Sequence, residues 1–435
     1  MAGKKLPALL GALALAAFLN GCATYSDWVG RMEADISSGK PDKALKVLES
    51  HASSKDEVLY LLNRAMLQRM AGDFEASNAS FETAKAMIDR LSAISVSEQS
   101  GALAVNDMMR SYTGDYYERV LVHVYEALNY LELNQPDQAR VEALQLDVIL
   151  KAHGDKSNYE DAFARYLTGM IYEDLGEWDD AMIAYRQAYE AYRRYPAQLD
   201  MPVPQRLKYD LIRLADKTGL EDEAKRYREK FGIDAVNPIP DKDGELVFIL
   251  NTGLAPIKRS IEVRAFTASG QLVTVSMPAY ESRRATVTAA RIRVDGAGAA
   301  TDLMEDVDTL AINALDNQKP VILARAVARA VLKTQASKQA DSRNDALGFV
   351  VNLAGAITDR ADTRSWSTLP NEICVARLPL PPGRHQVQVE LLDRLGGVVS
   401  TKSYEVEIEG RAKRFLSLHW VMADDLAASN PLRAQ

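Results

Sequence analysis

The hydrophobic and polar positions divide the chain into two unlike halves. From Trp28 to about Phe231, apolar residues recur at helical spacing in segments of a dozen residues or more, with almost no strand signals. From Glu245 onward, several segments alternate apolar and polar residues, as strands with one face in water do. The segment 237–244 between them holds two prolines, acidic residues and a glycine, which is typical of a linker and turn. The pattern predicts a helical region followed by a strand-rich one.

A recurring turn punctuates the helical half. At five places a Gly or Asn is followed, after a short turn and a helix start, by a small residue that opens the next helix. The pairs are Gly39 and Ala44, Gly72 and Ser77, Asn134 and Ala139, Gly176 and Ala181, and Gly219 and Ala224. Internal repetition of this kind indicates stacked helix pairs.

The clearest unit runs from Ala162 to Tyr195 and resembles the tetratricopeptide repeat, or TPR. Its signature residues are Gly169, Tyr172, Gly176, Ala181, Tyr185 and Ala188. We expect Gly169 to let the two helices approach closely, with Tyr172 packed across the contact. We expect Gly176 to cap the first helix, because a left-handed backbone is cheapest for glycine. Such arrays form a concave groove that usually holds peptides or partner proteins, although a rigid spacer or self-assembly surface is the alternative.

The second half is expected to be a separate strand-rich domain. The predicted strands are 245–251, 260–267, 271–277, 284–294, 386–392, 398–408 and 414–420. Two helices are predicted between them, one over 320–336 with Pro320 in its first turn and one over 344–357. The predicted fold class is multidomain, α then α+β. A leader (1–21) precedes a TPR-like α-solenoid (22–236), and a β-sandwich-like domain (237–435) follows with a helical insertion at about 319–361.

The N-terminus has the features of an export signal. Lys4 and Lys5 precede an apolar segment, Leu6 to Leu19, that is too short to span a bilayer as a stable helix. The small residues and cysteine that follow, ending at Cys22, look like the lipobox of bacterial lipoproteins. That resemblance implies cleavage before Cys22, modification of its thiol with a diacylglyceryl group, a mature protein with three acyl chains such as palmitate, and a permanent membrane anchor. An ordinary leader cut nearby and a retained anchor are the alternatives.

Net charge limits which partners the chain can bind, and cysteine content limits which disulfides it can form. The formal net charge of −8 opposes nonspecific binding to nucleic acid. If Cys22 is acylated, Cys374 is the only free thiol and no intramolecular disulfide can form. Cys374 lies in an alternating segment, so we expect a buried, inert thiol.

The polar and proline-rich segments 362–370 and 376–383 contain the candidate contact residues. Arg364, Trp366 and Arg377 are residue types that make specific polar or stacking contacts. The alternative is a loop that is pinned onto the sheet by an Arg–aromatic stack.

The sequence contains no familiar catalytic or metal-binding motif. No HExxH or GxSxG pattern occurs, no cysteine pair could hold zinc, and the five histidines are scattered. We therefore predict a non-enzymatic protein without metal or cofactor. A glycan hydrolase whose catalytic carboxylates are dispersed along the sequence remains an alternative function.

The lipobox, the repeats and the strand-rich region together resemble an uncharacterised family of Gram-negative TPR-containing outer-membrane lipoproteins. The resemblance implies a periplasm-facing location, which Ala23 after the cysteine also favours, but no known activity or binding residues. The expected function is a lipid-anchored scaffold or adaptor that binds protein partners through its TPR-like groove in a cell-envelope assembly. The alternative is a glycan-binding or glycan-cleaving accessory lipoprotein that uses its C-terminal domain, with exposed aromatics near Trp366. The oligomeric state stays open.

Overall fold

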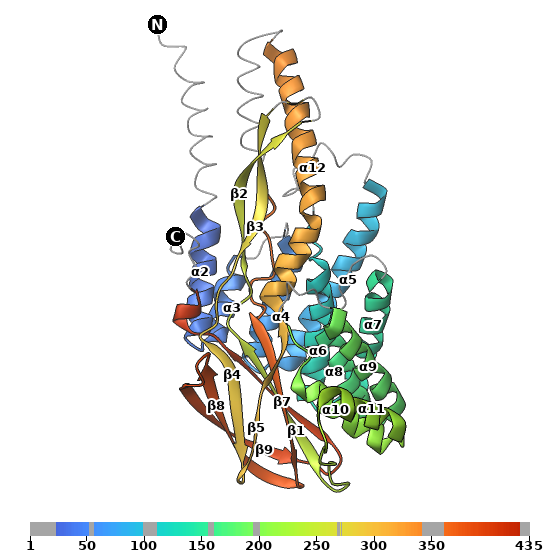
Figure 1. Ribbon diagram of the computed structural model, residues 1–435. Helices are drawn as coiled ribbons and strands as arrows, with labels where there is room; N and C mark the ends of the chain where they lie inside the picture. Colours follow the sequence, from blue (N-terminus) through green and yellow to red (C-terminus); the bar gives the residue numbers. More distant parts are fainter. Residues whose placement is uncertain are drawn as a thin grey trace.

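The computed structural model describes residues 23–51, 56–98, 111–154, 161–194, 201–267, 270, 272–341 and 361–426. The leader, Cys22 and the helix predicted over 344–357 lie outside these residues. The described chain forms a helical region followed by a strand-rich region with sheets (Figure 1). Among the described residues, no helix is both long and apolar enough to cross a membrane.

Consecutive helices of the N-terminal half pack in pairs, as in TPR solenoids. The pairs are α2 (Ala23–Ser37) with α3 (Pro41–Glu49), α4 (Glu57–Met70) with α5 (Phe74–Glu98), α6 (Tyr116–Glu132) with α7 (Pro136–Gly154), α8 (Ala162–Asp174) with α9 (Trp178–Arg194), and α10 (Gln205–Lys217) with α11 (Glu221–Phe231). Neighbouring pairs also contact each other, so the pairs form a continuous stack.

The same turn ends the first helix of every pair. At Gly176 the backbone has a φ of +74°. The N–H of Gly176 donates to the carbonyl of Glu173 and the N–H of Glu177 donates to that of Tyr172, at 3.1 and 2.8 Å. This is the Schellman arrangement, in which a left-handed residue satisfies the last carbonyls of a helix. Equivalent bonds and a positive φ occur at Gly39, Gly72, Asn134 and Gly219. The small residues that follow these turns are fully buried: Ala44, Ser77, Ala139, Ala181 and Ala224.

The helices α8 and α9 approach each other closely at Gly169. A Cβ atom at this position would lie 2.5 Å from Cδ1 and Cε1 of the Tyr185 ring. Tyr185 is fully buried, whereas Tyr172 is only half-buried and has the guanidinium of Arg140 over its ring. Tyr185, rather than the expected Tyr172, therefore lies against Gly169. Ala188 lies one turn further along the same buried face of α9.

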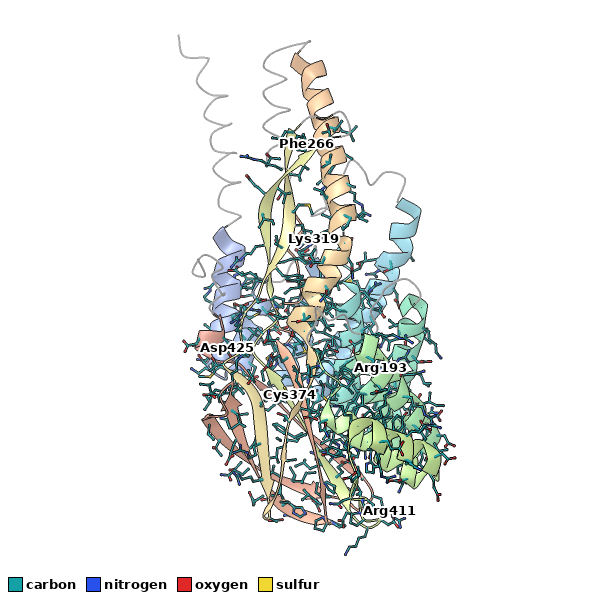
Figure 2. All side chains as sticks on the ribbon, viewed as in Figure 1. Arg193, Phe266, Lys319, Cys374, Arg411 and Asp425 are labelled. Carbon is teal, nitrogen blue, oxygen red and sulfur yellow. The ribbon has the colours of Figure 1, made fainter. Side chains whose placement is uncertain are left out.

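Within the described residues, the strands form two four-stranded sheets and one hairpin. The first sheet has the order β10-β1-β7-β6, with β1 (Gly244–Thr252), β6 (Asp302–Asp306), β7 (Glu372–Leu380) and β10 (Lys413–Trp420). The second has the order β5-β4-β8-β9, with β4 (Val287–Val294), β5 (Ala297–Ala300), β8 (Gly383–Asp393) and β9 (Val398–Ile408). β1 pairs with β10 in parallel and with β7 antiparallel. The two sheets share an apolar cluster that includes Phe248, Val389 and Cys374. Cys374 is labelled among the strands in Figure 2. Burial raises the pKa of the Cys374 thiol.

A hairpin and a long helix stand away from the rest of the molecule (Figure 1). They are β2 (Ile257–Phe266), β3 (Leu272–Glu281) and α12 (Val307–Asp341). The predicted helix start at Pro320 is wrong, because α12 begins at Val307 and Pro320 lies inside it. The side chain of Asp306 caps the helix by accepting hydrogen bonds from the N–H and hydroxyl of Thr309, at 2.9 and 2.6 Å. A short 3₁₀ helix, η5 (Ala423–Leu426), ends the described chain.

The close approach at Gly169 predicts that alanine substitutions at two helical glycines, Gly169 and Gly30, have opposite effects on stability. Replacing Gly169 with Ala should lower the free energy of unfolding by about 1–3 kcal/mol, because the added methyl group overlaps the ring of Tyr185, which is fully buried. Gly30 is also a helical glycine, and a Cβ there meets nothing within 4 Å. Its replacement with Ala should raise stability by up to about 1 kcal/mol. Urea unfolding of both variants measures the difference, and equal effects would contradict a close approach at Gly169.

Candidate functional site: the junction of the helix pairs and the strands

The inner face of the helical array is covered by the chain's own strands. The first helices of four pairs, α4, α6, α8 and α10, are mostly buried along their length. One apolar core contains Tyr125 and Leu167 from these helices together with Val247, Ile249 and Phe415 from β1 and β10. The face that other solenoids offer to partners is therefore occupied within this molecule.

Arg377 of β7 lies at the centre of this junction. Its guanidinium donates to carboxylates from three different elements, namely Glu173 on α8, Asp210 on α10 and Glu245 on β1. The distances to Glu173 and Asp210 are 3.0 and 2.9 Å, and Nε lies 2.9 Å from Glu245. The Tyr185 hydroxyl accepts a further bond at 3.0 Å. Arg377 thus ties the repeat unit to the first sheet with its side chain fully buried.

Three more cations complete the cluster around these carboxylates. They are Lys413, 3.0 Å from Glu245 and 3.2 Å from Glu173, Arg213, 2.7 Å from Glu173, and Arg206, 2.9 Å from Asp210. Tyr185 and Tyr166 donate hydroxyl hydrogen bonds to Glu173 and Asp210, at 2.6 and 2.7 Å. Each buried carboxylate therefore has several partners, which offsets the cost of burying its charge.

The electrostatics of the cluster keep these carboxylates ionised. Burial alone would raise the pKa of Glu245, but Arg377, Lys413 and Arg206 outweigh burial and hold it below its usual value. The pKa of Glu173 is likewise held well below its usual value, chiefly by Arg213 and Arg377 against the effect of burial. The arrangement binds two parts of one chain to each other.

Trp366 forms a second attachment between the two parts. Its side chain is 1% exposed and its ring contacts those of Phe81 and Tyr125 edge-on, at 5.8 and 6.3 Å between centroids. Its backbone N–H donates to Glu118 at 2.8 Å, and its indole N–H donates to Thr368 at 3.1 Å. The segment that carries Trp366 is thereby inserted among the helices.

Arg364 holds the same segment at its start. The guanidinium lies 2.9 Å from Asp56 and 2.7 Å from Asp362, and over the ring of Tyr112 at 5.5 Å from its centroid. Its side chain is 7% exposed.

The prediction that Arg364, Trp366 and Arg377 offer contacts to a partner is therefore corrected by their positions. All three are buried against this chain's own helices. The alternative anticipated an Arg–aromatic stack, and the Arg364 guanidinium does lie over the Tyr112 ring, but the loop is held on the helical part rather than on the sheet. Sequence alone shows the type of a residue but not what covers it. One residue of the cluster could have been recognised from the sequence. In α10, Asp210 lies between Leu207 and Leu211 in an apolar stripe, and this position indicates a buried carboxylate.

Three carboxylates converge elsewhere, on the second and third helix pairs. Lys85 lies 2.7, 3.1 and 3.2 Å from Glu126, Glu142 and Glu82, and His123 lies 2.6 Å from Glu142. Burial and the neighbouring Glu142 raise the pKa of Glu126 to about 9. The lysine ammonium already occupies the position between the carboxylates that a metal ion would need, so this group is an ion cluster between helices.

Comparisons with known proteins give only a distant likeness, and it is confined to the helical half. No protein family matches the chain, and no curated protein matches it by sequence. Solved structures with likeness to the helical half include MamA 41-end from Desulfovibrio magneticus RS-1, with 14% identity over 48% of this chain and 90% of that chain and a TM-score of 0.30. Another is a Podosopora anserina putative kinesin light chain with nearly identical TPR-like repeats, with 13% identity over 47% and 92% and a TM-score of 0.31. A tetratricopeptide repeat protein from Parabacteroides merdae shares 17% identity over 49% and 80%, with a TM-score of 0.23. Likeness at this level carries no argument about function.

Removing Arg377 should weaken the junction in a pH-dependent way. Arg377→Met should lower the free energy of unfolding at pH 7 by about 3–5 kcal/mol, because it leaves buried carboxylates with one partner fewer. The pKa values of these carboxyls are lowered in the fold, so their stabilising effect is present above the ordinary carboxyl pKa and is lost as the pH falls below it. The difference between wild type and variant should therefore shrink below about pH 4.5.

Urea unfolding between pH 7 and pH 3 measures this difference. The control is Arg384→Met on β8, whose side chain is 74% exposed and should matter little. An equal loss in the two variants would contradict the assigned role of Arg377.

Proposed function

We propose that this protein is a non-enzymatic, lipid-anchored scaffold of the cell envelope whose partners bind its outer surfaces. The observation that carries the proposal is the burial of α4, α6, α8 and α10 by the strand-rich part. A partner cannot enter this face without displacing the sheet and the Arg377 cluster. The groove-binding version expected from the sequence is therefore replaced by binding at the second helices.

The second helices offer a suitable surface. On α7, Val141, Leu144 and Val148 recur at helical spacing and are about half to two-thirds exposed, with Val148 at 67%. On α9, Ile183 is also exposed. A row of apolar side chains on the outside of a helix favours contact with a partner helix.

The membrane location is part of the proposal. A lipid on Cys22 would attach the chain immediately before α2, which begins at Ala23. The lipobox resemblance and Ala23 support an outer-membrane anchor that faces the periplasm. The partners would then be proteins of an envelope assembly and not nucleic acids.

The row on α7 should crosslink to the partner in cells. A photo-crosslinking amino acid in place of Val148 should capture a specific protein, whereas the same amino acid in place of Tyr125, which is fully buried, should not. The capture should weaken in a Leu144→Ser background and in a Cys22→Ala background, where the anchor is lost. Mass spectrometry identifies the captured protein. Equal capture at both positions, or none at Val148, would contradict binding through α7.

One structural observation favours the alternative function, in which the protein binds or cleaves a glycan. Trp366 no longer supports it, because that side chain is buried. However, a hollow of about 650 Å³ at the base of the hairpin is lined by Asp306, Asp308, Glu372 and three arginines. Burial and neighbouring carboxylates raise the pKa of Asp308 to about 6 and that of Glu372 to about 7. Carboxyls that titrate near neutral pH in a hollow are suited to acid–base chemistry on sugars.

This second candidate has a direct test. If it holds, the full chain retains or cleaves peptidoglycan or exopolysaccharide, and Glu372→Gln removes the effect because its carboxyl can no longer exchange a proton. Glu405→Gln, on the exposed side of β9, is the control. A chain that neither retains nor cleaves these glycans, measured by pull-down and reducing-end release, would rule this candidate out.

A further inference from the structure

The hollow at the base of the hairpin has the size of a small-ligand site. Its volume is about 650 Å³, within the range of pockets that hold small molecules. Its walls come chiefly from β2, β3, the first turns of α12 and the start of β7, which meet where the hairpin joins the rest of the molecule (Figure 1). The lining includes apolar side chains, Ile261, Tyr280 and Ile312, as well as charged ones. The hollow therefore offers contacts to both apolar and charged parts of a ligand.

The fold itself already uses part of the charge in the hollow. Arg259 on β2 lies 3.1 Å from Glu281 on β3, so these two side chains neutralise each other across the hairpin. Asp306 accepts the two hydrogen bonds from Thr309 that cap α12. These three charged groups are therefore accounted for without a ligand.

Four other charged groups line the hollow and are held apart from one another. They are two arginines, Arg284 and Arg394, and two carboxyls, Asp308 and Glu372. Within the described part of the chain, no close ion pair joins any of them to another residue. They come from four places in the fold, namely the β3–β4 connection, the β8–β9 turn, the first turn of α12 and the start of β7. Two charges of each sign thus line one space without neutralising each other.

Asp308 is the most deeply buried of these four groups. The residue is 9% exposed, and its Oδ1 atom has no hydrogen-bond partner among the described residues. Burial raises the pKa of Asp308 to about 6 with help from Asp306, although Ser282, Asn371 and Arg283 act in the opposite direction. A buried carboxylate oxygen without a donor costs free energy, so this position favours a ligand that brings a donor.

Glu372 has the same need for positive charge. Burial raises its pKa to about 7, the carboxyls of Asp306 and Asp308 add to this effect, and Arg394 only partly opposes it. A carboxyl with a raised pKa is one whose surroundings supply too little positive charge. A cationic group bound near Asp308 and Glu372 would be stabilised by both.

The arrangement of these charges selects among possible ligands. In the part of the chain that the structure describes, three metal-ligand groups converge on one point only at Glu82, Glu126 and Glu142, so the carboxyls of the hollow do not surround a single ion. Arginines in the same space would also repel a metal cation. A neutral sugar would leave charges of both signs without a partner. A ligand that carries an ammonium group and a carboxylate can satisfy both signs.

We propose that this hollow binds a short peptide with both ends free. The peptide's ammonium group contacts Asp308 and Glu372, and its carboxylate contacts Arg284 or Arg394. Its side chains lie against the apolar part of the lining. The inference goes beyond the anchored scaffold and depends neither on the anchor nor on the row on α7. It also assigns the hollow a class of ligand different from the glycan of the second candidate.

Calorimetric titration of the full chain with two tripeptides, Ala-Ala-Ala and Ala-Leu-Ala, tests the binding. At pH 7 at least one of them should bind saturably at one site. Its N-acetylated and C-amidated forms, each without one terminal charge, should bind at least about tenfold more weakly. An ammonium group beside the two carboxyls lowers their pKa, so binding should release protons, and affinity should fall towards pH 5 as both carboxyls become protonated.

Two variants connect each end of the peptide to its side chain. Asp308→Asn keeps the shape of the residue but not its charge, so it should bind the free and the N-acetylated peptide about equally. Arg394→Met should likewise bind the free and the C-amidated peptide about equally. The controls are Asp137→Asn, an exposed acid in the first turn of α7, and Arg384→Met, and both should bind as the wild type does. Urea unfolding shows whether each variant is folded, and Arg394 lies in an exposed turn where substitution should not impair folding.

Each other outcome overturns the proposal. No saturable binding of either peptide, or equal binding of the free and capped forms by the wild type, excludes a peptide with free ends as the ligand. Binding of the neutral disaccharide of N-acetylglucosamine in place of the peptides assigns the hollow to the glycan candidate. None of these results involves Cys22 or Val148, so the anchored scaffold is tested separately and its failure would leave this inference standing.

Discussion

The structure depends on one buried guanidinium and the carboxylates around it. Arg377 comes from the first sheet, while Glu173 and Asp210 come from two successive helix pairs and Glu245 from the neighbouring strand. None of these charges could be buried alone, because an unpaired ion in the interior costs several kcal/mol. The helix pairs and the sheet therefore have to meet in one register. Buried ion pairs are weak sources of net stability, so their main effect here is to define that register.

This constraint changes what a TPR-like array does in the molecule. A solenoid usually keeps its concave face for partners, but here the chain's own sheet and the Trp366 segment fill it. The repeats behave as one half of a larger body, which is why the proposed binding surface lies on the second helices. Structural likeness to TPR proteins consequently says little about where a partner would bind.

The sequence predicted features that depend on local interactions and missed those that depend on distant ones. The five helix-ending turns were readable because a left-handed residue and the small residue after it act within a few positions. β9 was placed at its observed bounds, because alternation marks a strand with one wet face. By contrast, Trp366 was assigned to the surface because its partners, Phe81 and Tyr125, lie more than two hundred residues away. The helix start at Pro320 failed because the Asp306 cap outweighs the proline signal.

The strand order has a consequence for how the chain is made. β1 pairs on one side with β7 and on the other, in parallel, with β10, the last strand. The first sheet cannot close until residues 413–420 are available, although the helix pairs can form as soon as they emerge. Until then, the apolar faces of α4, α6, α8 and α10 are uncovered, and long-range pairing of this kind is slow. During synthesis the protein therefore passes through a stage in which most of its repeats exist without their cover, and this stage is where a chaperone would be needed.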